Sequence, residues 1–251
     1  MKKEILILLF LALTIRLFSQ IDTLLSFSDI NNQMLFVTEE SALKAFNEGK
    51  PVYRLLLSSK GYRNLPNEIC NIISLQELQL PWNEQTKLNP NIIKLKNLQS
   101  LNLTWNFFSK FPEEICELKN LKFLNLPGNG KKELPSEFAN LVNLEHLILI
   151  NYNFKNFPEV LTQLPNLRVL VLSDCNIKSL PSSICNLTNL EILILSNNKL
   201  ELLPECIFDI NKLSELDLTG NKFNRKFNKE YIVESEMIEL KEYLISIKNK
   251  K

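Results

Sequence analysis

Residues 98–118 read LQSLNLTWNFFSKFPEEICEL, and the same pattern of leucine, asparagine and proline returns every 23 residues along the chain. The first leucine of each unit is found at Leu75, Leu98, Leu121, Leu144, Leu167, Leu190 and Leu213. A fixed period of this length is typical of proteins that stack one structural unit many times. We therefore expect seven units from Val52 to Lys212, and the start of an eighth at Leu213.

Each unit combines the residues of a short strand, a turn and a short helical segment. Leu101 and Leu103 are two residues apart, so in a strand both side chains point to the same face. Asn106 can donate and accept hydrogen bonds at the turn that follows. The step Phe111-Pro112, followed by Ile115, favours an extended piece and then a helical turn. A single coil of this kind cannot close a core, so each unit depends on its neighbours.

The pattern resembles the 23-residue form of the leucine-rich-repeat family, L-x-x-L-x-L-x-x-N-x-L-x-x-L-P-x-x-I-x-x-L, over residues 52–229. It is similar to bacterial leucine-rich-repeat proteins and to Ras-group leucine-rich-repeat scaffolds. The resemblance implies an α/β solenoid, a right-handed horseshoe with a parallel concave sheet, about eight repeats and helical caps at both ends. It also implies that a partner would bind on the concave sheet.

Three units depart from the family pattern. Leu88-Asn89 stands where the other units have an apolar residue followed by proline, and Tyr152 and Cys175 replace the turn asparagine. The asparagine itself recurs at Asn83, Asn106, Asn129, Asn198 and Asn221. Cysteine is a familiar substitute in this family, whereas Tyr152 predicts a local distortion.

Both ends of the array carry sequences that predict caps. Thr38 followed by two glutamates predicts a helix N-cap, and Gly49 and Pro51 predict the end of that helix. We therefore assign residues 20–51 to an N-terminal segment and cap. The array of residues 52–229 is followed by apolar residues at helical spacing, which predict a capping helix over residues 230–251. Its apolar face consists of Ile232, Met237, Leu240, Leu244 and Ile247.

Residues 1–19 have the layout of a secretory signal peptide. A charged start precedes the apolar run Ile5–Leu13, and Leu17 and Ser19 stand at the −3 and −1 positions. The apolar run is too short for a membrane span, which needs about 20 residues, so we expect no span in the mature chain. Arg16 is atypical of such leaders, which leaves an uncleaved anchor or a misread start as alternatives. We expect export to the periplasm, the cell surface or the medium.

Charge and cysteine content narrow the possible partners further. The formal net charge is +1, which argues against nucleic acid as a partner because that function needs a concentrated basic surface. The five cysteines leave at least one thiol free or in an intermolecular bridge. Cys185 and Cys206 stand on adjacent coils and are the plausible pair, although the spacing leaves open whether they are bridged. We expect most of the cysteines to be small buried apolar groups.

The chain lacks the residue combinations of an enzyme. Its one histidine, His146, has Phe123 and Val169 as lateral neighbours, and neither can act as a nucleophile or an orienting acid. Cys175 would lie about 20 Å from it. One histidine and scattered cysteines predict no metal site, and Gly128-Asn129-Gly130 does not follow the pattern of a phosphate loop. We predict a protein that is not an enzyme and that has no cofactor.

The outward residues of the strands predict a binding surface. Six of them, in three adjoining units, are apolar where polar side chains are expected: Ile148, Ile150, Val169, Val171, Ile192 and Ile194. Because all six are β-branched, strand propensity is one interpretation, and cover by a terminal segment or a second copy is another. A contiguous exposed apolar patch favours a partner surface.

Aromatic residues extend this candidate site. Trp82 and Trp105 occupy the same place in neighbouring units and are flanked by Phe123, while His146 stands in the same outward row as Phe123. Tryptophans of this kind are typical of interaction hot spots, and packing over the sheet edge is the alternative. These four residues and the six apolar ones are the candidate partner-binding residues.

The function that follows is a non-catalytic module that binds a protein or peptide on its concave face. Two alternatives remain at this stage. The apolar patch would give a structural, self-associating envelope protein if it paired with a second copy, so the chain is expected to be a monomer or a dimer. If the leader is misread, the same array would be an intracellular signalling scaffold.

Overall fold

The computed structural model describes residues 33–130, 133–154, 156–223, 232–233, 237, 240–243 and 245. The chain separates into two units, residues 1–35 and Phe36–Lys251, and the architecture below is that of the second unit. The signal peptide predicted for residues 1–19 lies outside the described residues, and so does most of the capping helix predicted for residues 230–251. At Ile232–Val233 that prediction is wrong, because these two residues form a strand.

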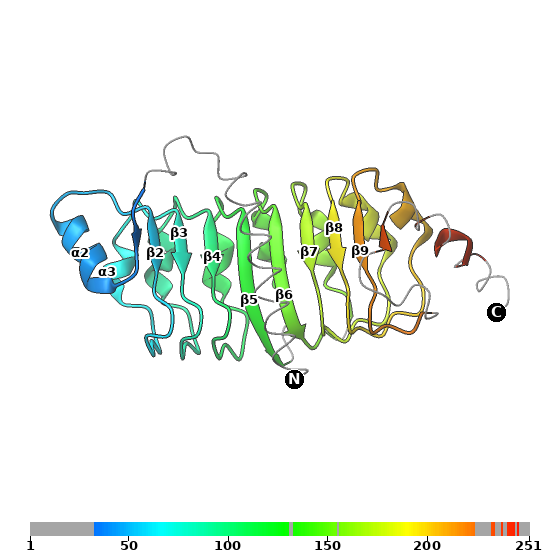
Figure 1. The fold of residues 1–251 in the computed structure, drawn as a ribbon, viewed down its shortest axis with the longest axis horizontal. Helices are drawn as coiled ribbons and strands as arrows, with labels where there is room; N and C mark the ends of the chain where they lie inside the picture. The colour runs from blue at the N-terminus through cyan, green and yellow to red at the C-terminus, as the bar shows by residue number, and fades with distance from the viewer. Residues whose placement is uncertain are drawn as a thin grey trace. The chain divides into compact units, whose positions relative to one another are not determined.

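Each coil contributes one short strand to a single sheet (Figure 1). The strands are β2 (Arg54–Leu56), β3 (Glu77–Gln79), β4 (Ser100–Asn102), β5 (Phe123–Gly130), β6 (His146–Tyr152), β7 (Val169–Val171), β8 (Ile192–Ile194) and β9 (Glu215–Asp217). All neighbouring pairs from β2 to β9 are parallel and follow the order of the chain. A two-residue strand β1 (Leu35–Phe36) precedes them, and β10 (Ile232–Val233) pairs antiparallel with β9. The predicted parallel sheet of a leucine-rich-repeat solenoid is confirmed.

Short helices form the other layer, and Figure 1 shows them behind the strands. They are α3 (Asn67–Cys70) and the 3-10 helices η2 (Pro90–Lys94), η3 (Glu113–Glu117), η4 (Ser136–Asn140), η5 (Glu159–Gln163), η6 (Ser182–Asn186) and η7 (Glu205–Asp209). All except η2 start directly after a proline, whose fixed φ and missing N–H suit a helix start. The predicted sequence of strand, turn and helical turn is therefore confirmed.

The hydrophobic core fills the space between the strands and the helices. Leu98, Leu101 and Leu103 are fully buried in it, as are Ile115 and Leu118 from the helical part of the same coil. Burying one such side chain stabilises the fold by about 1.5–3 kcal/mol. The predicted inward direction of the strand leucines is confirmed.

Asparagine side chains join neighbouring coils at the turn. The Nδ2 of Asn106 donates to the carbonyl oxygens of Leu80 and Leu103 at 2.8 and 3.0 Å, and its Oδ1 accepts from the N–H of Gln85 at 3.0 Å. Asn83, Asn198 and Asn221 make the equivalent bonds. Cys175 keeps one of them, since its Sγ donates to the carbonyl oxygen of Leu149 at 3.1 Å.

The sheet is irregular where Tyr152 replaces the asparagine. β5 and β6 have 8 and 7 residues, whereas the other strands from β2 to β9 have 3. Their pairing shifts between Pro127 and Gly130. Tyr152 is fully buried, and a Cβ on Gly128 would lie 2.4 Å from the backbone of Asn151 and 2.5 Å from the Tyr152 ring. Only glycine fits there, and the predicted local distortion is present.

Helical residues lie at both ends of the described array. α2 (Glu39–Asn47) begins after Thr38, whose hydroxyl accepts from the N–H of Ser41 at 3.2 Å, as the N-cap pattern predicts. Ala42 and Ala45 of this helix are part of the hydrophobic core. Near the C-terminus, Leu240 is fully buried in the same core and Met237 packs against it.

Candidate functional site

The strands place alternate side chains on opposite faces of the sheet. Leu147, Leu170 and Leu193 belong to the core, so the residues on either side of each one point away from it. We call this second side the outer sheet face. The strand register sets His146 beside Val169 and Val169 beside Ile192, and it sets Ile148, Val171 and Ile194 side by side in the same way. The predicted rows are therefore neighbours in space.

The expectation that this apolar patch is exposed is wrong. Ile148 is 2% and Val171 is 1% exposed, and Val169 and Ile194 are also buried. Ile150 and Ile192 are half-buried. The four buried residues lie outside the core cluster, so their burial arises on the outer side of the sheet. Close packing of β-branched side chains in register, about 4.8 Å apart, contributes to it.

The outer sheet face is mostly polar over β2, β3 and β4, where several of its side chains bond to one another. Arg54 forms an ion pair of 2.6 Å with Glu77, and the Gln79 amide also donates to Glu77. On β4 the Oδ1 of Asn102 accepts from the N–H and the hydroxyl of Thr104 at 3.0 and 2.5 Å. These polar groups are therefore satisfied within the protein.

The polar and apolar parts meet at Asn125 of β5 and His146 of β6. Asn125 is 2% exposed, and its Nδ2 has no hydrogen-bond partner. His146 is buried with its ring centroid 6.5 Å from that of Phe123, which is also buried. Burial lowers the pKa of His146 to about 4, and nearby Arg168 contributes, so the ring is neutral near pH 7. No described residue hydrogen-bonds to this ring.

At the far end of the apolar rows, β9 carries two carboxylates on the same face. Asp217 is buried and its Oδ1 accepts from the N–H of Thr219 at 2.8 Å, while Glu215 is half-buried. Within the described part of the chain neither carboxylate forms an ion pair. Neither residue is among the candidate residues of the sequence analysis.

Trp82 and Trp105 form an exposed stack just beyond β3 and β4. Their ring centroids are 4.6 Å apart, their planes differ by 12°, and the residues are 50% and 45% exposed. Phe107, which the sequence analysis did not single out, is exposed nearby in the chain. Sequence reasoning placed the two tryptophans together correctly, and the structure leaves half of each open to solvent.

The backbone at both tryptophans is in the left-handed region, with φ of 58° and 57°. The same place in other coils also has positive φ, and it holds Ser59, Asn151, Asp174, Asn197 and Gly220. A bulky residue is an outlier there, and such conformations cost on the order of 1–3 kcal/mol. The two aromatic rings are thus held at positions that the fold normally gives to small polar residues or glycine.

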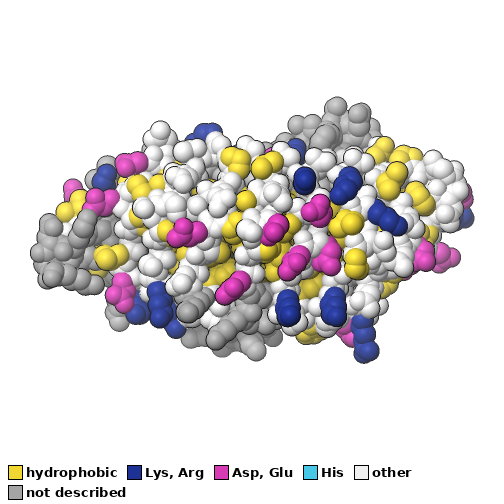
Figure 2. All heavy atoms as spheres, turned by 180° about the vertical axis from the view of Figure 1, so that it is seen from behind, with side chains coloured by type: hydrophobic (Ala, Val, Ile, Leu, Met, Phe, Trp, Pro, Cys, Tyr) yellow, Lys and Arg dark blue, Asp and Glu magenta, His cyan; other side chains and the backbone are white. Residues whose placement is uncertain are grey.

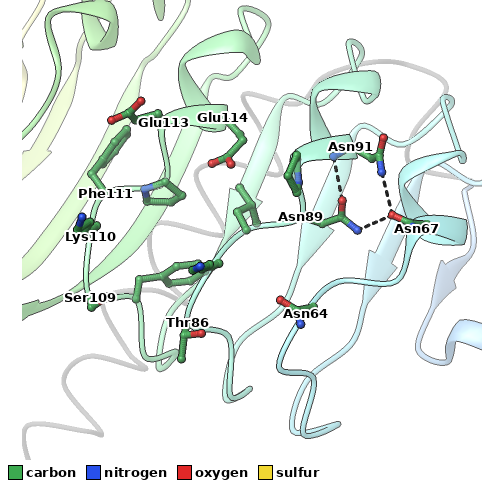
Figure 3. Close-up of a pocket in the computed structure, with 15 residues that line it drawn as sticks. Asn64, Asn67, Thr86, Asn89, Asn91, Ser109, Lys110, Phe111, Glu113 and Glu114 are labelled. Atoms are coloured by element: carbon green, nitrogen blue, oxygen red, sulfur yellow. Dashed lines mark hydrogen bonds between the residues drawn. The ribbon is translucent and has the colours of Figure 1, made fainter.

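A pocket of about 640 Å³ lies on the helical side of the coils, next to the departure at Leu88-Asn89 (Figure 3). The Nδ2 of Asn89 donates to the carbonyl oxygen of Leu65 at 2.6 Å and to the Oδ1 of Asn67 at 2.9 Å. The Nδ2 of Asn91 donates to the same Oδ1 at 2.8 Å. The asparagines thus connect neighbouring coils where proline is missing, and we assign them a structural role.

The structure resolves the pairing that the sequence left open, because Cys185 and Cys206 form a disulfide between adjacent coils. Cys70, Cys116 and Cys175 are buried free thiols. Burial raises the pKa of Cys70 to about 11 and that of the other two to about 12. A buried thiol with a raised pKa is a poor nucleophile, so these three cysteines are structural groups.

The described residues contain neither a group of metal ligands nor a membrane-spanning helix. They include no cluster of three or more side chains that could hold a metal ion. None of their helices is long and apolar enough to cross a membrane. Figure 2 shows the opposite side from Figure 1, and there basic and acidic side chains are interspersed.

Comparisons with known proteins agree with this architecture. Two leucine-rich-repeat family models match residues 165–223 and 97–118. A leucine-rich-repeat protein of Leptospira interrogans is similar in structure, with 31% identity and a TM-score of 0.62 over 83% of this chain and 56% of that one. The plant peptide hormone receptor RGFR1, solved in complex with RGF2, has 28% identity and a TM-score of 0.52 over 68% of this chain and 28% of that one.

Internalin C2 of Listeria monocytogenes shares the fold, at 20% identity and a TM-score of 0.56, over 67% of this chain and 72% of that one. A comparison with curated protein sequences gives no match. The chain spans about half of the Leptospira protein and about a quarter of the plant receptor, by the coverages of 56% and 28%.

Proposed function

The chain belongs to the leucine-rich-repeat family, and from this premise we propose that it is a non-catalytic module that binds a protein or peptide on the outer sheet face. We take this face to be the concave one. The observation that carries the proposal is the stack of Trp82 and Trp105, which is half exposed. Two large aromatic side chains in a strained backbone conformation are a feature that the coil itself does not need. Tryptophan is the residue type most enriched in binding hot spots.

Two further features support a binding role. Of the ten candidate residues of the sequence analysis, four are open to a partner: the exposed Trp82 and Trp105 and the half-buried Ile150 and Ile192. RGFR1, which is similar to this chain at 28% identity, was solved in complex with RGF2. We propose that Ile150 and Ile192, which are half-buried, form the apolar part of the same partner surface.

We also propose that the protein works outside the cytoplasm. The layout of residues 1–19 is that of a signal peptide, and the disulfide between Cys185 and Cys206 is a bond that persists in oxidising compartments. This favours an exported binding module over an intracellular scaffold. The protein isolated from its native cells should begin at Gln20. After unfolding it should have three titratable thiols without reductant and five with it. A start at Met1 with five thiols would contradict export.

The binding proposal is tested by site-specific photocrosslinking in native cells. A benzoylphenylalanine in place of Phe107, beside the tryptophans in the chain, should give a discrete adduct with one partner. The matched control has the same group in place of Val142, which is also exposed but lies two residues after the end of the helix η4. Adducts of equal yield and size from both positions, or from neither, would refute a partner at the tryptophan stack.

The role of the two tryptophans is tested by Trp82→Asn with Trp105→Asn in the same crosslinking experiment. Asparagine keeps the turn, because Asn151 and Asn197 have the same positive φ in other coils. We expect the yield of the adduct from position 107 to fall at least about tenfold, which corresponds to the loss of one hot spot. An unchanged yield would remove the stack from the site.

A further inference from the structure

The residues that follow each strand form a basic edge of the solenoid. We call it the turn edge and define it as residues 58–64 and the matching seven residues of each later coil, up to 219–225. It lies at the end toward which the strand arrows point in Figure 1. The turn edge includes 11 Lys or Arg and 4 Asp or Glu, a net charge of +7. The other residues of the array 52–229 include 9 and 13, a net charge of −4.

The charge of the array is therefore separated, although the whole chain is nearly neutral. Part of the basic excess is known from the sequence alone, because four of the 11 residues lie outside the described ones: Lys131, Lys132, Lys155 and Arg225. The described part of the edge is still basic, with 7 Lys or Arg against 4 Asp or Glu.

The exposed aromatic side chains stand on this edge, at its β2 to β4 end. The tryptophan stack and Phe107 all belong to it. Hydrogen bonds hold neighbouring coils together here, since the N–H of Lys60 donates to the Oδ1 of Asn83 at 3.0 Å and the N–H of Phe107 donates to the carbonyl oxygen of Gln85 at 2.8 Å. Lys60 is therefore one coil, about 4.8 Å, from the residue that follows Trp82. Aromatic contact area and basic charge share one surface.

Three lysines at this end carry an unpaired charge. Lys60, Lys87 and Lys110 are exposed, and none of them forms an ion pair with a described residue. The carboxylate of the turn edge at this end, Glu84, already pairs with Arg63 at 3.2 Å. Three positive charges therefore remain available to a partner beside the tryptophan stack.

The other carboxylates around this end leave the lysines without a counter-charge. They are Glu39, Glu113, Glu114 and Glu133. Glu39 accepts a hydrogen bond from the Tyr62 hydroxyl. Glu113 and Glu114 line the pocket of Figure 3 together with Lys87 and Lys110, and Glu133 is exposed in the next coil, but none of these three carboxylates forms an ion pair with a described residue. Exposed charges further apart than about 8 Å are largely screened at physiological ionic strength.

We propose that the partner at the tryptophan stack presents an acidic peptide segment to the turn edge, with an apolar or aromatic side chain against the stack and Asp or Glu beside it. Opposite charge is the complement of the lysines, and apolar contact is that of the stack. This inference rests on the proposed binding function and names the chemistry of its partner. The coils of β2, β3 and β4 are two steps of about 4.8 Å apart, which an extended segment crosses with about three residues. The acidic side chains are therefore expected within a few residues of the contact.

The direct test reads the sequence of the partner at the contact. The adduct of benzoylphenylalanine at position 107 is digested, and tandem mass spectrometry identifies the crosslinked residue of the partner. Within about five residues on either side of it, we expect Asp and Glu to outnumber Lys and Arg by at least two. A neutral or basic segment would overturn the inference, while the adduct itself would leave the binding function standing. If position 107 gives no adduct, the partner is lost and the inference with it.

Variants of the protein test whether the lysines contribute to the binding. Lys60→Gln, Lys87→Gln and Lys110→Gln together should lower the adduct yield at least about fivefold, which is the scale of three exposed ion pairs. The matched control, Lys44→Gln with Lys96→Gln and Lys119→Gln, removes the same charge from exposed positions outside the turn edge and should leave the yield unchanged. Equal yields from the two triple variants would contradict a partner that is selected by the charge of the edge.

A lipid surface is the other partner that combines negative charge with apolar contact. Flotation of the protein isolated from its native cells with vesicles of phosphatidylglycerol and phosphatidylcholine tests it. We expect the protein to stay unbound at physiological ionic strength. Flotation of the parent protein that is lost in the Lys60, Lys87 and Lys110 variant would assign the turn edge to lipid headgroups and overturn the acidic peptide.

Discussion

The coils of β2 to β4 and those of β6 to β8 have the same backbone register and opposite outer faces. In the first group, outward side chains such as Arg54 and Glu77 pair with each other. In the second group, outward side chains such as Ile148 and Val171 are aliphatic and buried. The inward leucines are alike in both groups. The repeat thus dictates the core side of each coil and leaves the outer side free, which is why differences between coils on that side carry functional information.

The sharpest test of this comparison is to truncate one side chain on each face of β7 to alanine. Leu170→Ala removes a fully buried core side chain, and we expect it to lower the free energy of unfolding by about 2–5 kcal/mol. Val171→Ala, one residue further on, should cost less than half as much, because its contacts lie outside the core. Urea unfolding measures both. Equal losses would mean that the outer rows are as structural as the core.

The second prediction concerns His146 at the border of the two groups. Burial lowers its folded-state pKa to about 4 from 6.5, so the unfolded chain takes up a proton at a higher pH than the folded one. The neutral ring therefore leaves stability intact above pH 6.5, and stability falls as the pH drops from about 6.5 to about 4. A shift of this size corresponds to about 3 kcal/mol.

His146→Gln removes this titration and keeps a polar side chain of similar size. Urea unfolding near pH 7 and near pH 4 should show a loss between the two that is smaller in the variant by about 3 kcal/mol. The carboxylates of Glu145 and Glu191, which lie near Arg168, are present in both proteins, so the difference between variant and parent reports on the histidine. An identical pH dependence of variant and parent would show that the ring is not buried as a neutral group.

The third prediction concerns the core of the polar coils, where Gln85 occupies the place of Phe108, Ile177 and Leu200 in other coils. Gln85 is fully buried, and neither its Oε1 nor its Nε2 has a hydrogen-bond partner. We expect Gln85→Leu to raise the free energy of unfolding by about 1–3 kcal/mol, the usual cost of an unsatisfied buried group. Gln79→Leu, which breaks a bond to Glu77, is the matched control and should not stabilise. A loss of stability in Gln85→Leu would show that the amide has a partner in solution.

These residues show which parts of the structure the sequence alone could predict. The spacing of Leu101, Leu103 and Asn106 was sufficient to predict a strand, its buried face and the turn, because a 23-residue period fixes where each side chain stacks. It could not predict that Val171 is buried, since periodicity gives the direction of a side chain and not what covers it. The positive φ of Trp105 could have been predicted from the sequence, because Asn151, Asp174 and Gly220 hold the same place in other coils and tolerate that conformation.

The smallest effect on stability is expected where the effect on binding is largest. Replacing Trp82 and Trp105 with asparagine relieves a left-handed backbone at two bulky residues, worth about 1–3 kcal/mol each, and loses a stack worth about 0.5–1.5 kcal/mol. The relief at the two residues exceeds the loss of the stack, so urea unfolding should show a stability raised by about 1 kcal/mol or more. If the two rings served only to pack against each other, their removal would instead make the variant less stable than the parent protein. A partner that contacts both rings would explain why the strain at the two exposed tryptophans is retained. The tryptophans of the polar coils would then anchor the partner, and the apolar coils would add contact area.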